Sequence, residues 1–369
     1  MTDKETIIFN KAERILISNR YPPNRYKWGS YRMISPSQGH FLGVWNWDSA
    51  FHAIGMIDID IEIAKEQILG FLHFQKEDGL LPDVIWENGE IVDTFSKPPV
   101  MAYAAVKVYE SCNDIEFLKK VYPMLVLNEK FWTGKRLHNG LLHYDANRSD
   151  GCDDKKYYTW VCYESGWDNS PRWDGKPQDL WPIDLNCFMV MTYRSLARMA
   201  KELGFDDNEW RTKEKELVRN IEKYLWNEQL KAYTDYDFVE QSFSDVLTPA
   251  SFMPLFIETA SKERAEYMNT VAQKHFLPGM PTVAYDDPSY STDYWRGPCW
   301  LNVAYFAAKG LKNYGFTETA EIIKSTVLEW IYNDGNTIHE NYNSKTGEGI
   351  NSPDFSWSCV FAREFIKNI

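Results

Sequence analysis

The feature that most constrains the fold is an alternation of short and long connections between segments that have helical periodicity. Apolar residues recur at helical spacing in these segments, whereas strand-like alternation is rare and short. The predicted helices span 3–18, 46–57, 59–75, 98–111, 114–132, 181–203, 207–226, 248–258, 261–274, 297–313, 316–333 and 354–367. Short turns fall near Asp58, Cys112, Gly204, Thr259 and Tyr314, and long connections span 19–45, 76–97, 133–180, 227–247, 275–296 and 334–353.

This alternation predicts where the long connections emerge. Consecutive antiparallel helices place alternate connections at opposite ends, so all the long ones should leave from one face. Six such hairpins close into an all-α (α/α)6 toroid, in which an inner ring of helices rich in small and apolar residues is wrapped by an outer ring. A plain helical bundle or a solenoid would not explain why only alternate connections are long. No linker-like segment divides the chain, which predicts a single domain over 1–369.

Charge and composition exclude several classes of partner. The 40 basic and 53 acidic residues leave a net charge of −13, which disfavours nucleic acid and anionic membrane surfaces. No run of apolar residues is long enough to cross a membrane, and Met1 to Ile17 lacks the pattern of a signal peptide. The six cysteines form no CxxC pair. We therefore expect a cytoplasmic protein with a small polar ligand, and the sequence leaves its oligomeric state open.

Acidic and aromatic residues gather in two distant loop segments. The stretch 164–173 contains Glu164, Asp168 and Arg172 among tryptophans, and Gly and Pro interrupt it, so we expect a binding surface rather than a core. Glu340 opens a second polar segment. A single acid in a loop is usually solvated or caps a helix. Two acids brought together can cleave a glycosidic bond, and flat aromatic rings suit the apolar faces of a sugar.

Two further polar-aromatic segments, 38–48 and 294–300, also fall in long connections or at helix starts. On the predicted toroid all four segments would meet at one face. Their candidate sugar-binding residues are Phe41, Trp45, Trp47, Asp48, Gly166, Arg172, Tyr294, Trp295, Arg296 and Trp300. Structural alternatives are open for these residues and for Asp184: Asp48, Asp184 and Arg296 could cap helices or form ion pairs. The tryptophans could pack at the rim, and Arg172 could bridge loops.

Other chemistries find little support in the sequence. HExxH, GxGxxG, P-loop and GxSxG motifs are absent. The segment 145–151 resembles a calcium loop, but its Gly falls one position late, so we predict no metal and no cofactor. A sugar isomerase or epimerase dependent on His40 or His339 remains an alternative. A sugar-binding protein without catalysis and a retaining glycosidase are two others.

Four segments resemble glycoside hydrolase family 63 and the related trehalases. They read GVWNWDSAF at 43–51, ESGWDNSPRW at 164–173, YWRGPCW at 294–300 and ENYNSKTGEG at 340–349, and WPIDLN at 181–186 adds to them. The resemblance covers roughly 38–360 and implies an inverting α-glycosidase on an (α/α)6 toroid. It implies Asp168 as general acid and Glu340 as general base. It also implies that Trp45, Trp47, Asp48, Trp295, Arg296 and Trp300 line the site for the terminal sugar.

The proposed chemistry sets conditions on both acids. In an inverting enzyme the two carboxyl groups lie about 6.5–9.5 Å apart, so that a water molecule fits between the base and the sugar. We expect Trp167 and Trp173 to limit the solvation of Asp168 and so keep it protonated near neutrality. Glu340 should receive hydrogen-bond donors that keep it charged. The resemblance points to the compact bacterial branch of the family, whose substrates are small α-glycosides, and leaves glucose or mannose open.

Overall fold

The computed structural model describes residues 1–148 and 151–369. Its α-helices are α1 (Asp3–Ser18), α2 (Asn46–Met56), α3 (Ile61–Leu72), α4 (Met101–Cys112), α5 (Ile115–Lys135), α6 (Asp154–Ser165), α7 (Ile183–Glu202), α8 (Asn208–Tyr224), α9 (Met253–Phe256), α10 (Lys262–Val271), α11 (Leu301–Asn313), α12 (Thr317–Asn333) and α13 (Ser356–Asn368). The strands are short: β1 (Gly43–Trp45), β2 (Val84–Trp86), β3 (Ile91–Val92), β4 (Leu137–His138), β5 (Leu141–Leu142), β6 (Leu180–Trp181), β7 (Trp226–Asn227), β8 (Ala232–Tyr233), β9 (Tyr236–Asp237), β10 (Ser242–Phe243), β11 (Asn341–Tyr342) and β12 (Gly349–Ile350). Helix dominates the described residues, which confirms the predicted all-α class.

The predicted helices agree with the structure except at two places. The expected helix 248–258 is a 3-10 turn over Pro249–Phe252 followed by the single turn α9. Pro249 and Pro254 each occupy a first turn, where a missing N–H is tolerated, so each begins a new short element instead of continuing one. The second difference is α6, which lies inside the connection 133–180 that we predicted to be loop. Residues 149 and 150 of the calcium-like segment lie outside the described residues.

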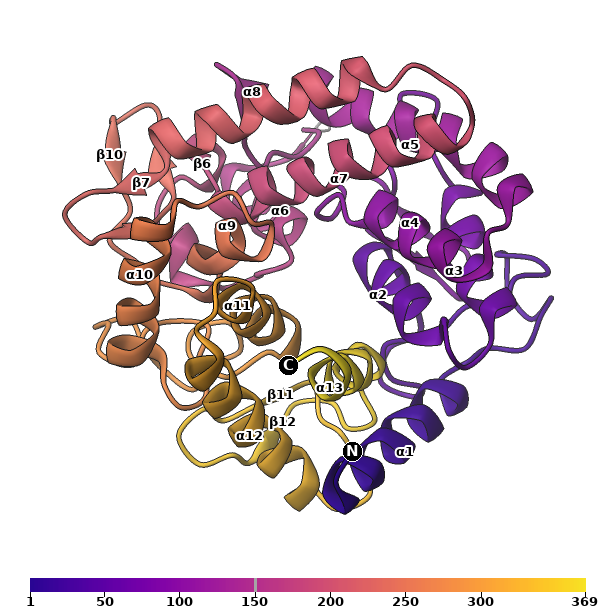
Figure 1. Cartoon of the computed structure of the whole chain (residues 1–369). Coiled ribbons are helices and arrows are strands. Elements are labelled where there is room, and N and C mark those ends of the chain that lie inside the picture. Colours follow the sequence, from indigo (N-terminus) through magenta and orange to yellow (C-terminus); the bar gives the residue numbers. More distant parts are fainter. Residues whose placement is uncertain (149–150) are drawn as a thin grey trace. The chain divides into compact units, whose positions relative to one another are not determined.

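Contacts divide the chain into two compact units. The first contains Met1–Ile17, Asn169–Cys187 and Ile221–Ile369, and the second contains Ser18–Asp168 and Phe188–Asn220. The second unit is built on α2, which packs against α3 and α4, and these helices lie next to one another in Figure 1. Side chains of Asp60 and Asp114 cap the starts of α3 and α5 by accepting backbone N–H bonds. The antiparallel sheet β1-β2-β3 extends from the start of α2.

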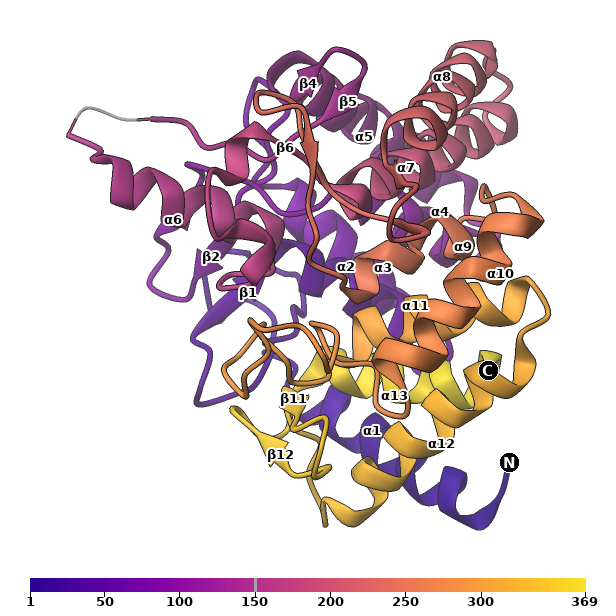
Figure 2. The same cartoon turned by 90° about the vertical axis from the view of Figure 1, so that its left-hand side faces the viewer.

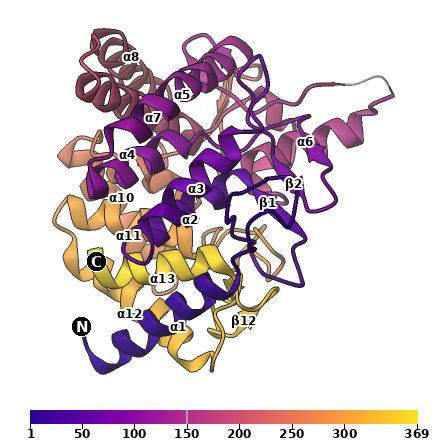
Figure 3. The same ribbon diagram turned by 90° about the vertical axis from the view of Figure 1, so that its right-hand side faces the viewer.

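The first unit is centred on α11, which contacts α9, α12 and α13. Figure 2 shows α11, α12 and α13 close together, and Figure 3 shows α1 running along α13. Arg363 of α13 pairs with Glu13 of α1 at 3.0 Å. The β11-β12 hairpin precedes α13, and a bridge between Cys299 and Tyr342 joins it to the segment before α11. The predicted single domain over 1–369 stays a prediction.

Within the described residues, no helix is both long and apolar enough to cross a membrane. The same residues contain no group of three or more His, Cys, Asp or Glu side chains that could hold a metal ion.

Candidate active site

A cavity of about 330 Å³ opens beside Asp168 in the second unit. Its lining combines aromatic rings with three charged side chains: Trp45, Asp83, Val84, Trp86, Val92, Phe95, Lys97, Trp160, Tyr163 and Asp168. The sheet β1-β2-β3 supplies one wall and the last two turns of α6 supply another. Flat rings around a few charged groups are the lining expected of a sugar site.

The end of α6 places Asp168 at this cavity. Gly166 ends the helix in the left-handed conformation, with φ of +74°, and the Ser165 hydroxyl accepts a hydrogen bond from the Trp167 N–H at 3.0 Å. A side-chain carbon at Gly166 would lie 2.4 Å from the Trp47 ring. Glycine is therefore required both for the backbone conformation and for the close approach of Trp47.

Asp168 has the electrostatics of a carboxylic acid that can hold a proton. Its side chain reaches the cavity, but surrounding protein atoms desolvate it, and this burial is the main cause that raises its pKa to about 6. The charge of Lys97 lowers this pKa and that of Asp83 raises it. A general acid that works near neutrality needs a pKa of this kind.

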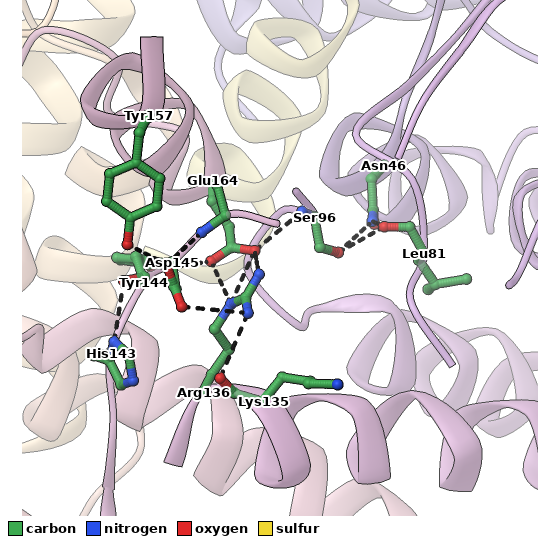
Figure 4. A network of polar contacts seen from close by, with 11 residues as sticks. Asn46, Leu81, Ser96, Lys135, Arg136, His143, Tyr144, Asp145, Tyr157 and Glu164 are labelled. Carbon is green, nitrogen blue, oxygen red and sulfur yellow. Dashed lines mark hydrogen bonds and ion pairs between the residues drawn. The ribbon is translucent and has the colours of Figure 1, made fainter. Parts of the chain in front are cut away.

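The neighbouring Glu164 has a structural role that the sequence did not reveal. Its carboxylate is fully buried and accepts hydrogen bonds from Arg136 at 3.0 Å, from the Ser96 N–H at 3.1 Å and from the Asp145 N–H at 2.7 Å. Figure 4 shows this network, in which Tyr157 also bonds to Asp145. The expectation that 164–173 lies outside any core is wrong for Glu164, Trp167 and Trp173, which are all buried. Arg136 neutralises the buried acid.

Glu340, the predicted base, stands at the start of the β11-β12 hairpin in the first unit. It is 3% exposed and accepts hydrogen bonds from the Tyr294 hydroxyl at 2.8 Å and the Ser352 N–H at 3.3 Å. Its carbonyl accepts from Ser358 at 3.0 Å. Donors directed at a carboxylate stabilise its charged form, which is the form that a general base needs.

The segment 294–300 is a compact aromatic cluster next to this hairpin. Trp295 and Trp300 stack with ring centres 3.9 Å apart, and Trp357 packs edge-on against both. The Trp300 indole donates to the Tyr294 carbonyl at 3.0 Å, while Tyr294 itself has a positive φ of 42°. A left-handed tyrosine is strained, and such strain is typical of functional sites. The structure thus brings the predicted residue Tyr294 to Glu340.

Two predicted arginines are engaged in ion pairs within the first unit. Arg172 is 4% exposed, and its guanidinium lies 2.7 Å from Asp184 and 2.8 Å from Asp235. This geometry favours the alternative that Arg172 bridges loops over the expectation that it binds a ligand. Arg296 pairs with Asp174 at 2.6 Å in a more exposed position. No pattern in the sequence marked Asp235 as a partner of Arg172. The two residues are far apart in the chain and meet only in the folded protein.

The remaining predicted sugar-binding residues differ in their exposure to the cavity. Phe41 packs edge-on against Trp45, which lines the cavity and contacts Trp86 in the same way. Trp47 and Asp48 are nearly buried at the start of α2. Asp83 and Lys97 are lining residues that the sequence analysis missed. His339, the candidate of the isomerase alternative, pairs with Asp334 at 2.8 Å.

Comparison with solved structures defines the fold class. The mannosylglycerate hydrolase of glycoside hydrolase family 63 from Thermus thermophilus, in complex with glucose, superimposes with a TM-score of 0.83 and 24% identity over 98% of this chain and 100% of that chain. The neutral trehalase Nth1 from Saccharomyces cerevisiae does so with a TM-score of 0.78 and 18% identity over 97% and 80%. These likenesses confirm the predicted (α/α)6 toroid as the fold class.

The family follows from the sequence itself. Residues 42–358 match the family described as the mannosylglycerate hydrolase MGH1-like glycoside hydrolase domain, and the chain belongs to this family. The periplasmic trehalase of Escherichia coli O1:K1 / APEC is 27% identical over 90% of this chain and 68% of that protein. The resemblance to family 63 and the trehalases is confirmed, and the protein is a glycoside hydrolase.

Proposed function

We propose that this protein is an inverting α-glycosidase that releases a terminal glucose or mannose from a small α-glycoside. The observation that carries the proposal is Asp168, an acid with a pKa of about 6 at an aromatic-lined cavity of about 330 Å³. A cavity of this size suits one or two sugar-sized groups.

In the proposed reaction, protonated Asp168 donates its proton to the glycosidic oxygen as the bond to the anomeric carbon breaks. Glu340 takes a proton from the water molecule that attacks the anomeric carbon from the opposite side. The configuration at that carbon inverts because no covalent intermediate forms. Tyr294 and the Ser352 N–H support this role of Glu340, since both donate to its carboxylate.

The aromatic residues provide binding rather than chemistry. Trp45 and Trp86 present indole rings to the cavity and can pack against the apolar face of a sugar ring. Their bulk, with that of Trp160, also limits the water that reaches Asp168, which favours its protonated form. We also propose that the site for the terminal sugar includes Trp295, Trp300, Trp47 and Asp48.

The relatives support a small substrate. One solved structure is a mannosylglycerate hydrolase in complex with Tris and D-glycerate, and the Escherichia coli relative is a trehalase, so the substrates named for these two proteins are small glycosides. We propose the same class here, with no cofactor and no nucleic acid or membrane as partner. The net charge of −13 supports the exclusion of nucleic acid. A cytoplasmic location stays a prediction.

The test is hydrolysis of a panel of α-linked disaccharides together with mannosylglycerate and glucosylglycerate, scored by the monosaccharide released. Proton NMR should show the β-anomer of the cleaved sugar first. Asp168→Asn and Glu340→Gln should each lower the rate by about 10²–10⁴-fold or more while glycoside binding persists. Early release of the α-anomer would contradict inversion. A wild-type rate in either variant would remove that residue from its role.

A further inference from the structure

Asp83 and Lys97 form a buried ion pair in the wall of the cavity that contains Asp168. The Lys97 Nζ lies 3.2 Å from Oδ1 of Asp83, and the two side chains are 7% and 9% exposed. Lys97 also donates to the carbonyl oxygen of Tyr163, five residues before Asp168. Lys97 thus lies between Asp83 and Tyr163, and its charge acts in surroundings where water screens charge weakly.

The pair is anchored through Ser96, the residue next to Lys97. The Ser96 N–H donates to Glu164 at 3.1 Å, and its hydroxyl donates to the Leu81 carbonyl at 2.7 Å. The Asn46 amide donates to the same hydroxyl at 3.4 Å, which is the third contact of Ser96, as Figure 4 shows. Ser96 therefore ties the segment of Lys97 both to the segment of Asp83 and to the end of α6 that carries Asp168.

The other ionisable groups near Asp168 differ in the charge that they carry. From α6, Glu164 is neutralised by Arg136, and Tyr163 stays neutral because burial raises its pKa above the usual value. From α2, Asp48 acts on Lys97. Burial works against the charge of Lys97, yet the nearby Asp83, Asp168 and Asp48 outweigh it and raise the pKa of this lysine. The positive charge of Lys97 thus persists beside Asp168 throughout the range in which Asp168 titrates. Burial raises the pKa of the Asp83 carboxyl, and the charge of Lys97 opposes that shift.

We infer that Asp83 and Lys97 are positioning residues that fix the pH range in which Asp168 remains a proton donor, Lys97 favouring its ionised form and Asp83 its protonated form. The inference rests on the proposed function, since it concerns the acid of that reaction. It goes beyond the reaction because it assigns opposite effects on the protonation of Asp168 to Lys97 and Asp83, which themselves transfer no proton in the reaction. Opposite effects are what distinguish an electrostatic role from support of the fold.

The kinetic test follows kcat/KM against pH, whose high-pH limb reports the ionisation of the acid in the free enzyme. Asp83→Asn removes a negative charge, so Asp168 should lose its proton more readily and the limb should move to lower pH by about one unit. Adding Lys97→Met to this variant removes the positive charge, so the limb should move back to higher pH. A limb that stays in place, with kcat/KM reduced equally at every pH, would overturn the inference and make Asp83 a binding group.

A second measurement does not depend on hydrolysis. In protein labelled with ¹³C at the aspartate carboxyls, the resonance lost in Asp168→Asn identifies Asp168, and its titration can be compared between the wild type and Asp83→Asn. A midpoint that does not fall in Asp83→Asn refutes the inference. If the wild type cleaves no glycoside, the proposed function fails, while this titration still decides the role of the pair.

Controls separate charge from folding. Glu116→Gln removes one charge from the exposed Glu116–Lys119 pair on α5, whose groups are 2.7 Å apart, and should move neither the limb nor the midpoint. Circular dichroism checks that each variant is folded. If Asp83→Asn does not fold, Asp83→Ser removes the same charge with a smaller side chain and carries the same expectation.

Discussion

At the scale of single residues, the two predicted acids have contrasting surroundings. Asp168 is desolvated at an aromatic cavity and its pKa is raised to about 6, whereas Glu340 accepts hydrogen bonds from Tyr294 and Ser352. A general acid and a general base require this difference, because one must hold a proton and the other must be free to accept one. The sequence alone placed both acids in polar segments but could not assign their environments.

The raised pKa of Asp168 predicts how activity depends on pH. The acid is competent only when protonated, and it loses the proton as the pH rises through about 6, so kcat/KM of the wild type should fall above that pH. An unperturbed aspartate, with a pKa of about 4, would cause the same decline some two units lower. Initial rates at low substrate from pH 4 to 9 measure the limb. A decline that begins near pH 4 would contradict the assignment.

Gly166 gives a second prediction at this scale. Gly166→Ala places a side chain where φ is +74° and where the Trp47 ring would be 2.4 Å away, so the turn that carries Asp168 must shift. We expect a loss of about 1–3 kcal/mol in the free energy of unfolding and a fall in kcat. Chemical denaturation and steady-state kinetics measure these effects. Gly175→Ala is the matched control, since no atom lies within 4 Å of its added carbon and it should change neither quantity.

At the scale of elements, α6 holds the site together through Glu164 at its end. Glu164 joins Arg136, the Ser96 N–H and the Asp145 N–H around one buried carboxylate. Removing one partner of a buried ion pair leaves the other charge unpaired. Glu164→Gln should therefore cost about 3–5 kcal/mol of stability, measured by urea unfolding. Glu116→Gln, in an exposed pair, should leave the unfolding midpoint unchanged, and equal stability of both variants would rule out the anchoring role.

The helices show which elements local sequence can predict. Helices such as α5, α8 and α12 have an apolar stripe and charged exposed positions, so their periodicity is visible without tertiary information. The buried residues of α6 are confined to its last two turns, so it has no continuous stripe, and its clear local signals are confined to its ends, at Asp153 and Gly166. The expected helix 248–258 was wrong because two prolines divide it.

At the scale of the whole molecule, the chain should work without a metal ion. The described residues contain no metal-ligating group of three or more side chains, and the proposed chemistry uses two carboxyl groups. Treatment with EDTA followed by desalting should therefore leave the rate of hydrolysis unchanged. Loss of activity that calcium restores would instead point to the segment 145–151 and overturn this prediction.

The sequence by itself determined the helical class, most helix boundaries and the family, because periodicity, caps and motifs are local in the chain. It also drew attention to Trp45 and Asp168 of the cavity lining, but not to the charged lining residues of 83–97. Only the tertiary structure decided which polar groups are paired. Three buried ion pairs join residues from different segments of the chain: Arg172 with Asp235, Glu164 with Arg136, and Asp83 with Lys97. The proton affinity of Asp168 is likewise decided in three dimensions. Burial raises its pKa, while the charges of Lys97 and Asp83 act on it in opposite directions, and none of these effects can be read from adjacent residues.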